Sequence, residues 1–193
     1  MNIILASKSP RRREILSNLG LQFEIVTADT DESSDIINGA ELAQELSARK
    51  AIAVKDVLES QGDYCDDTLI IGCDTVVCCD DNILGKPRDN ADAKRMLNLL
   101  SGREHSVISG LNLLYNGQKL TSFEETKVFF DSLNEKEIED YIASGEPCDK
   151  AGAYGIQGLA SKFIGRIEGC YFNVVGLPVN LLYRMLKQIK NDN

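Results

Sequence analysis

Residues 106–130 read SVISGLNLLYNGQKLTSFEETKVFF, and this stretch decides the fold class. Asn116-Gly117 joins two strand-like segments, near 106–115 and 119–130, and Asn-Gly is a strong signal for a tight hairpin between antiparallel strands. Strands and helices alternate along the rest of the chain. A hairpin in the middle of that alternation predicts an α/β fold with a mixed sheet.

Apolar runs on either side of the hairpin predict the remaining strands. Leu69–Cys73 is a strongly apolar strand that ends at Asp74, and Val76–Cys79 continues extended into a turn at residues 80–82. The other predicted strands are Asn2–Ala6, Phe23–Thr27 and stretches around Phe163 and Phe172.

Helices are predicted where apolar residues recur at helical spacing and where capping signals mark the ends. They begin with Ser9-Pro10, Ala40, Asp89 or Asn90, Asn134 and Pro178. No internal repeat, low-complexity stretch or linker interrupts the pattern. Residues 1–193 are therefore predicted to form one domain, a mixed β-sheet flanked by helices.

Composition narrows the function classes. The net charge of −9 argues against a nucleic-acid-binding protein, which needs a broad basic face. A small anionic ligand is still compatible with it, because a few basic residues can focus a positive field within one cleft. No apolar stretch is long enough to cross a bilayer and no signal peptide is recognisable, so a soluble cytoplasmic protein without a membrane partner is expected.

The six cysteines have no Cys-x-x-Cys spacing, and the chain has one histidine. A zinc site is therefore not expected, and the cysteines are predicted to be reduced and mostly buried thiols. His105 precedes a predicted strand and is interpreted as a structural residue. With one histidine, a Ser-His-Asp hydrolase has little support.

The first candidate site is Ser7-Lys8-Ser9-Pro10-Arg11-Arg12-Arg13, between a strand and a helix. Helix N-termini offer unpaired amides to anions, and the hydroxyls, the lysine and three arginines add further donors. The alternative is a capped helix whose arginines are only solvated. The concentration of basic residues favours phosphate binding over that alternative.

The second candidate is Asp74, at the predicted carboxyl end of a buried strand, where open α/β sheets present groups to ligands. Such a carboxylate can hold a divalent metal or activate water as a general base. An aspartate after a strand is also common in ordinary turns. Asp31-Glu32, in an acidic loop, is a weaker candidate for a metal ligand, because acidic loop residues are usually only solvated.

Three further segments carry basic or amide groups. Gly85-Lys86-Pro87-Arg88 is a loop with two cations, and Lys50 falls inside the apolar stripe of a long helix. Each has an ordinary interpretation, as a solvated turn and as a snorkelling lysine. Residues 149–158 are rich in glycine, which allows close backbone approach to a ligand, and Gln157 carries both a donor and an acceptor that can read the edge of a base. The alternative for this segment is a plain connector.

Taken in order, these segments resemble the Maf family over nearly the whole chain. The residues that carry the resemblance are Ser7-x-Ser9-Pro10-Arg11-Arg12, Asp31-Glu32, Ala48-Arg49-Lys50-Ala51, Asp74-Thr75-Val76-Val77, Gly85-Lys86-Pro87, Gly102-x-x-His105-x-Val107 and the segment from Asp149 to Gly158. Cys73 and Asn173 stand where alanine and serine are frequent in the family. Neither difference is expected to remove catalysis.

The resemblance implies an elongated mixed sheet with a central cleft, like that of the inosine triphosphate pyrophosphatases. It implies hydrolysis of a nucleoside triphosphate between the α- and β-phosphates, with a divalent cation, Mg²⁺ or Mn²⁺. The site residues that it implies are Asp74 as proton acceptor, Arg11, Thr75 and Gln157 for substrate choice, Ser9, Arg12, Lys50 and Lys86 for phosphate contacts, and Glu32 with Asp74 near the metal.

The Gly-Ile-Gln-Gly form at residues 155–158 is similar to the family branch that prefers dTTP and UTP, and it extends the expectation to modified pyrimidine triphosphates. Prevention of non-standard nucleotide incorporation and a homodimer are further expectations from the family. So is a link to septum formation and cell-division arrest. The main rival is a non-enzymatic nucleotide-binding regulator of cell division, and a nucleic-acid-binding module is disfavoured by the acidic balance.

Overall fold

In the computed structural model, which describes residues 1–191, seven strands form one mixed sheet. Their order is β2-β1-β3-β5-β6-β7, and β4 pairs with β3 off this path. β1 is parallel to β2 and to β3, whereas every other pair is antiparallel. The strands are β1 (Asn2–Ala6), β2 (Glu24–Ile25), β3 (Thr68–Cys79), β4 (Asn82–Leu84), β5 (Glu104–Tyr115), β6 (Gln118–Phe130) and β7 (Ile164–Glu168).

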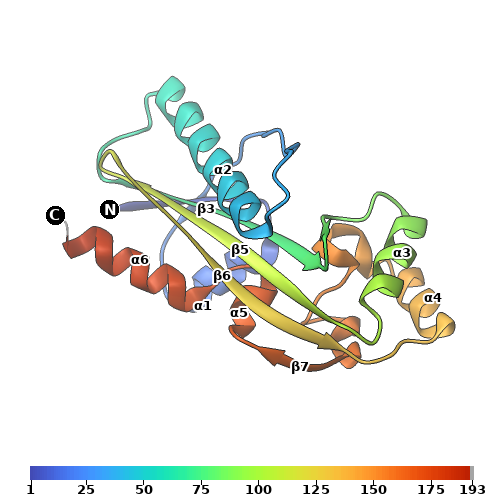
Figure 1. The fold of residues 1–193 in the computed structure, drawn as a ribbon. Helices are drawn as coiled ribbons and strands as arrows, with labels where there is room; N and C mark the ends of the chain where they lie inside the picture. Colours follow the sequence, from blue (N-terminus) through green and yellow to red (C-terminus); the bar gives the residue numbers. More distant parts are fainter. Residues whose placement is uncertain (192–193) are drawn as a thin grey trace.

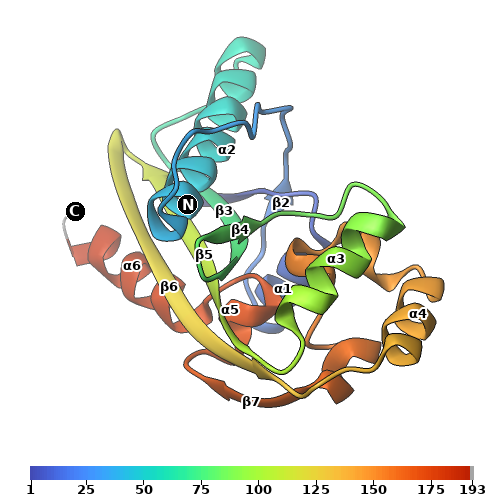
Figure 2. The ribbon, with the colours of Figure 1, turned by 45° about the vertical axis from the view of Figure 1, so that its right-hand side comes forward.

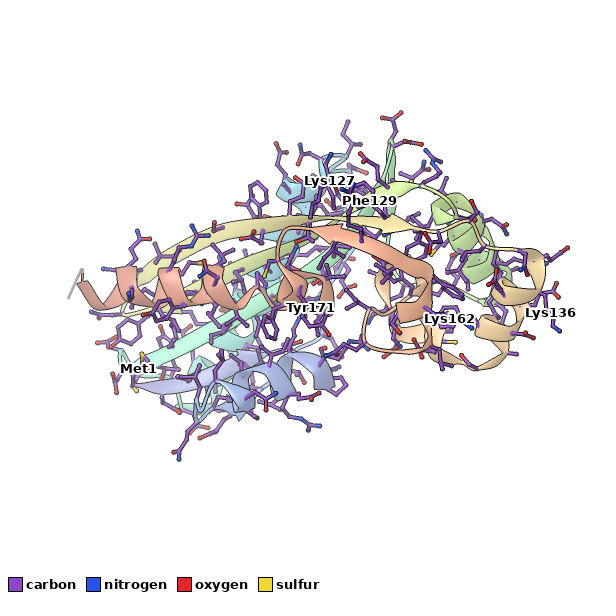
Figure 3. All side chains as sticks on the ribbon, turned by 90° about the horizontal axis from the view of Figure 1, so that it is seen from below. Met1, Lys127, Phe129, Lys136, Lys162 and Tyr171 are labelled. Atoms are coloured by element: carbon purple, nitrogen blue, oxygen red, sulfur yellow. The ribbon has the colours of Figure 1, made fainter. Side chains whose placement is uncertain are left out.

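The predicted hairpin is confirmed, and it forms the long axis of the molecule (Figure 1). Asn116 and Gly117 both have positive φ, 48° and 72°, as a two-residue turn that matches the twist of its strands requires. The paired strands β5 and β6 run from this turn to the opposite end of the molecule. Seen from below, Met1 and Lys136 mark the two ends, so the predicted elongated shape is also confirmed (Figure 3).

Helices cover both faces of the sheet. α2 (Gly39–Gln61) lies on one face, while α1 (Pro10–Asn18), α5 (Tyr171–Val175) and α6 (Val179–Asn191) pack on the other (Figures 1 and 2). α3 (Asn90–Leu100), α4 (Glu135–Ala143) and the 3₁₀ turns η1 (Glu146–Asp149), η2 (Ala151–Ala153) and η3 (Leu159–Phe163) cover the far end of the sheet around a second hydrophobic cluster. No helix of the described residues is long and apolar enough to cross a membrane.

Three predicted elements differ from the structure. The stretch around Phe172 is helical, in α5, because Asn173 anchors it to the sheet through the Val107 carbonyl and the Thr126 hydroxyl. The second strand is only two residues long, since it pairs with β1 at two positions. The cysteines are less buried than predicted, because Cys65 and Cys148 are exposed; all six thiols are free.

The position of Asp74 is also different from the prediction. It does not end a strand but lies inside the 12-residue strand β3. β1 pairs with β3 only as far as Gly72, and β4 begins to pair with it at Val77. Residues 73–76 therefore have β5 on one side and no strand on the other, so the sheet is open at Asp74 as it would be at a strand end.

Candidate active site

A cleft of about 1260 Å³ opens at the unpaired edge of β3. Its walls come from the N-terminus of α1, the loop before α2, α2 itself, the loop after β4, and the glycine-rich segment after η2. All nine residues predicted from the sequence to form a site line this one cleft, although they are spread over most of the chain. They are Ser9, Arg11, Arg12, Glu32, Lys50, Asp74, Thr75, Lys86 and Gln157.

The centre of the cleft is an ammonium group between two carboxylates. Lys50 Nζ forms an ion pair with Asp74 Oδ1 and lies 2.8 Å from Glu32 Oε1. The side chains of Lys50 and Asp74 are mostly buried. Asp74 is supplied by the sheet, Lys50 by α2 and Glu32 by the loop, so the group joins three elements that are far apart in sequence.

The contact between Lys50 and Asp74 depends on a close approach of α2 to the sheet. A Cβ at Gly72 would overlap the Ser47 carbonyl, and one at Gly110 would overlap the Ala43 carbonyl. Glycine at both positions lets the helix backbone lie directly on the strands. Side chains of a strand alternate between faces, so Asp74 shares the face of Gly72 and points toward the helix that carries Lys50.

Electrostatics keep Lys50 and Glu32 charged. Burial alone would lower the pKa of Lys50, but the Asp74 and Glu32 carboxylates outweigh burial and raise it. The hydrogen bond from Lys50 in turn lowers the pKa of Glu32. Lys50 is therefore a cation at neutral pH and Glu32 an anion.

The loop that carries Glu32 is tied to α2 by a second residue. Arg49 Nη1 donates to the backbone carbonyls of Asp31, at 3.1 Å, and Ser33, at 2.9 Å. Glu45 holds the same guanidinium through its Nε. Neighbouring residues of α2 thus secure the loop backbone and the Glu32 carboxylate.

Arg12 is far more buried than a solvated arginine. Nε donates to the Gly176 carbonyl, Nη1 to the Cys73 carbonyl and to Ser7 Oγ, and Nη2 to Thr75 Oγ1, at distances from 2.7 to 3.1 Å. Four of its five N–H groups are therefore engaged by the protein itself, and one is left for a ligand. The bond to Cys73 takes the place of a strand partner at the opening in the sheet.

The other residues of the basic motif differ in position. Arg11 lines the cleft and lies 3.8 Å from Asp149 Oδ2, on the opposite wall. Ser9 is the N-cap residue of α1, as predicted, but its side chain makes no capping hydrogen bond, so it does not bind its own helix. Arg13 is exposed outside the cleft, and only two of the three arginines belong to the site.

Thr75 points to the face of the sheet opposite to Asp74. Its hydroxyl accepts from Arg12 and lies 2.8 Å from Ser109 Oγ on β5, which in turn donates to the Asn173 carbonyl. Ser109 is fully buried. Both faces of β3 therefore contribute to the cleft, because the sheet is open at this edge.

Three acidic and two basic residues of the lining were given no role from the sequence. They are Asp29, Glu146, Asp149, Lys8 and Lys150. The glycines on both sides of Gln157 were a usable signal, because they imply that neighbouring side chains fill the space beside them. Across the lining there are six basic and five acidic residues, against 21 and 30 in the whole chain, so the cleft is enriched in positive charge as predicted.

His105 has the structural position that was predicted for it. It is buried, its Nε2 lies 2.7 Å from the Tyr154 hydroxyl, and its ring packs edge-on against Phe130 and Tyr154. Burial lowers its pKa to about 4. A neutral, enclosed imidazole of this kind is part of the core around α3 rather than of the cleft.

The donor set of the cleft suits a hard cation that also binds its substrate. Among residues 1–191 no three His, Cys, Asp or Glu side chains converge. Asp74 and Glu32, however, already share one cation, the Lys50 ammonium. Mg²⁺ is commonly held by one or two carboxylates together with substrate phosphates, and these two residues fit that pattern.

Known proteins resemble this chain in sequence over nearly its whole length. The sequence model of the family described as "Maf-like protein" matches residues 2–189. The dTTP/UTP pyrophosphatase of Geobacillus sp. (strain WCH70) is 50% identical over 189 residues, which cover 97% of each chain. The dTTP/UTP pyrophosphatase of Carboxydothermus hydrogenoformans is 50% identical over 190 residues, covering 97% of this chain and 98% of that one.

Among solved structures, that of the Staphylococcus aureus Ham1 protein superposes with a TM-score of 0.47 at 12% sequence identity. The match covers 67% of this chain and 72% of that one.

Proposed function

The chain belongs to the Maf family, and from this premise we propose that it is a nucleoside triphosphate pyrophosphatase that cleaves dTTP and UTP into the monophosphate and pyrophosphate. The curated relatives of similar length carry the name dTTP/UTP pyrophosphatase. The observation that carries the proposal is the pairing of Lys50 with both Asp74 and Glu32 inside a cleft enriched in basic residues.

In this proposal Asp74 is the general base. Its carboxylate sits at the open edge of β3, where a water molecule and the α-phosphate can both reach it. It takes a proton as the water attacks the α-phosphorus, and the bond from that phosphorus to the bridging oxygen breaks as pyrophosphate leaves. Charge develops on the departing pyrophosphate, and fixed cations nearby stabilise it.

Four residues are proposed to contact the phosphates. Ser9 offers a hydroxyl not used for capping, and Lys86 is exposed at the cleft. Arg12 offers the single N–H that its buried bonds leave over. Lys50, now bonded to both carboxylates, is a cation that can turn toward phosphate once they have another partner.

A divalent cation would be held by Asp74 and Glu32. When bound, it would offset the negative charge of the triphosphate and orient it. The two carboxylates would then keep the cation on the α2 side of the cleft, and Arg49 would keep the Glu32 loop in place beside it.

Arg11, Thr75 and Gln157 are proposed to select the base. Gln157 is exposed at the cleft, and its amide carries a donor and an acceptor. The ring of uracil or thymine presents an N–H beside two carbonyls, whereas cytosine presents an acceptor and an amino group. A side-chain amide can pair with either ring, in opposite orientations of its oxygen and nitrogen, so a preference for uracil and thymine requires the amide of Gln157 to be held in one orientation. Such pairing would also accept pyrimidines modified elsewhere on the ring.

Wider roles rest on the family and on composition. Removal of non-standard nucleotides before their incorporation, a link to cell-division arrest and a homodimer are part of the proposal. Six free thiols fit a reducing compartment, which supports action in the cytoplasm.

The test is a pyrophosphate-release assay with UTP, dTTP, CTP and GTP, with and without Mg²⁺ or Mn²⁺. We expect cation-dependent release from UTP and dTTP, and a loss of turnover of about a thousandfold or more in Asp74→Asn, because the base is removed. The matched control is Asp29→Asn, which changes another carboxylate of the lining that pairs only with Lys8.

Pyrophosphate release that persists in Asp74→Asn would remove this residue from the reaction. If no nucleotide is cleaved although binding is measurable, the chain is a nucleotide-binding regulator and not an enzyme.

A further inference from the structure

The wall of the cleft that carries Gln157 is held by two side chains to which the reaction assigns no part, Glu146 and Lys150. Residues 155–158 read Gly-Ile-Gln-Gly, and Gln157 is exposed within them. Neither glycine is needed for a left-handed backbone, because neither has positive φ. Each glycine is needed because a neighbouring side chain occupies the place where a Cβ would stand.

The space beside Gly155 is filled by the stem of Lys150. A Cβ on this glycine would stand 2.7 Å from Lys150 Cε and 2.8 Å from Cδ. The ammonium of Lys150 donates to the Glu146 carbonyl at 2.6 Å and pairs with Asp149 at 2.7 Å. Lys150 therefore passes under the segment and is fixed at its far end.

The space beside Gly158 is filled by the carboxylate of Glu146, which a Cβ on this glycine would overlap. Glu146 Oε2 accepts the backbone N–H of Leu159 at 2.8 Å. Oε1 accepts the hydroxyl of Tyr141 at 3.0 Å, and Tyr141 is 2% exposed in α4. The carboxylate thus joins a buried helix to the residue that directly follows the segment.

We propose that Glu146 is a positioning residue for substrate choice, which fixes the Gly155–Gly158 segment so that Gln157 meets the base in one orientation. The proposal rests on the proposed function and deepens it. Glu146 belongs to the cleft lining, but each of its carboxylate oxygens already accepts a hydrogen bond from the protein. Its effect is therefore transmitted through the backbone.

The physical reason is the steep dependence of hydrogen bonds on geometry. Discrimination between uracil and cytosine by one amide requires the donor and acceptor of Gln157 to be held in register with the base, because a misaligned bond favours neither ring. A connector rich in glycine has a large conformational freedom of its own. The Glu146 carboxylate accepts one bond from buried Tyr141 and one from Leu159, and these bonds restrict the segment so that Gln157 can distinguish the two bases.

The experiment measures equilibrium binding of the non-hydrolysable α,β-methylene analogues of UTP and CTP to the full chain. We expect the preference of wild type for the UTP analogue to fall about tenfold in Glu146→Gln, since the amide can accept only one of the two bonds. Tyr141→Phe keeps the carboxylate and removes one bond, so a smaller loss of about threefold is expected. The matched control is Glu139→Gln, at a residue on the same helix as Tyr141. It breaks an ion pair with Lys94 and should leave the preference unchanged.

Tyr141→Phe also separates positioning from direct contact, because the buried hydroxyl cannot touch a nucleotide. A loss of preference in Glu146→Gln alone, with Tyr141→Phe equal to wild type, would overturn positioning in favour of direct contact. An unchanged preference in both variants would overturn the proposal outright, and Tyr141→Phe decides if Glu146→Gln does not fold. If wild-type protein binds both analogues equally, the proposed choice between pyrimidines is refuted instead. A parallel assay of pyrophosphate release by wild type tests the proposed activity separately.

Discussion

Gly72 of β3 lies so close to Ser47 of α2 that a methyl group on the glycine would overlap the Ser47 carbonyl. This contact sets the distance between the sheet and the helix, and with it the meeting of Asp74 and Lys50. The Lys50–Asp74 ion pair of the cleft is thus positioned by a pair of residues that do not line it.

Gly72→Ala should therefore impair both stability and turnover. Overpacking of this kind typically costs about 1–3 kcal/mol, and a displacement of about 1 Å at a reacting group can lower the rate about a hundredfold. Circular-dichroism melting and the rate of pyrophosphate release measure the two effects. Gly165→Ala in β7 is the control, since the nearest atoms to its methyl group belong to the side chain of the exposed Asp131, which can turn away. Wild-type turnover in Gly72→Ala would show that the helix can shift without moving Lys50.

Lys50→Gln should change metal binding and turnover in opposite directions. The Lys50 ammonium competes with a metal for Asp74 and Glu32, so its removal should tighten Mn²⁺ binding to the nucleotide-free protein by about tenfold. Turnover should fall, because a phosphate-contacting cation is lost. Calorimetric titration with Mn²⁺ measures the first effect, and Lys55→Gln is the control, because this lysine lies on the same helix but pairs with Glu59 and Tyr64 away from the cleft. Weaker Mn²⁺ binding in Lys50→Gln would contradict a shared site.

Arg12→Lys should destabilise the fold, although the charge is kept. A lysine cannot reproduce the four bonds that the guanidinium makes to Ser7, Cys73, Thr75 and Gly176. We expect a loss of about 3 kcal/mol, which is roughly 6–12 °C in Tm for a chain of this size. Arg13→Lys, at an exposed neighbouring position, should leave Tm within about 1 °C. Equal melting of both variants would mean that the buried bonds contribute nothing net.

His105 should make the protein less stable in mild acid. Its pKa is about 4 in the folded state and 6.5 when it is exposed, so between these values the unfolded chain binds a proton that the folded chain does not. The stabilising effect is complete above pH 6.5 and declines as the pH falls toward 4, by about 2 kcal/mol between pH 6.5 and pH 5. Urea unfolding of wild type and His105→Gln at both pH values measures it. The variant should lose about 2 kcal/mol less than wild type over that range; equal losses would contradict burial of the neutral ring.

Local signals predicted most of the fold. The Asn-Gly turn and the caps depend on residues close in sequence, and the corresponding hairpin and helix ends are where they were expected. The apolar runs located the strands but not all of their ends, because β2 is shorter and β3 longer than expected. The stretch around Phe172 was misassigned because its helix is fixed by Asn173, whose partners lie on distant strands. Tertiary contacts of this kind leave no local pattern.

The candidate site could be predicted in membership but not in geometry. Nine residues chosen from motifs line one cleft, yet the motifs gave no sign that Arg12 is nearly saturated by the protein. The sequence predicted that Asp74 ends its own strand. In the structure β3 continues, and the opening beside Asp74 arises because the neighbouring strand, β1, ends. Glu146 was missed because its partners, Tyr141 and Leu159, are identified only by the folded chain.

At residues 73–76, β3 has a strand partner on one side only, whereas before and after this span it has partners on both sides. β1 pairs with it before the span, next to the cluster around α1 and α6, and β4 pairs with it after the span, next to the cluster around α3. A substitution that weakens the pairing of β3 with β1 or with β4 should therefore displace the span that carries Asp74 and Thr75. The catalytic rate of this protein should therefore respond to packing in two hydrophobic clusters that lie mostly outside the cleft.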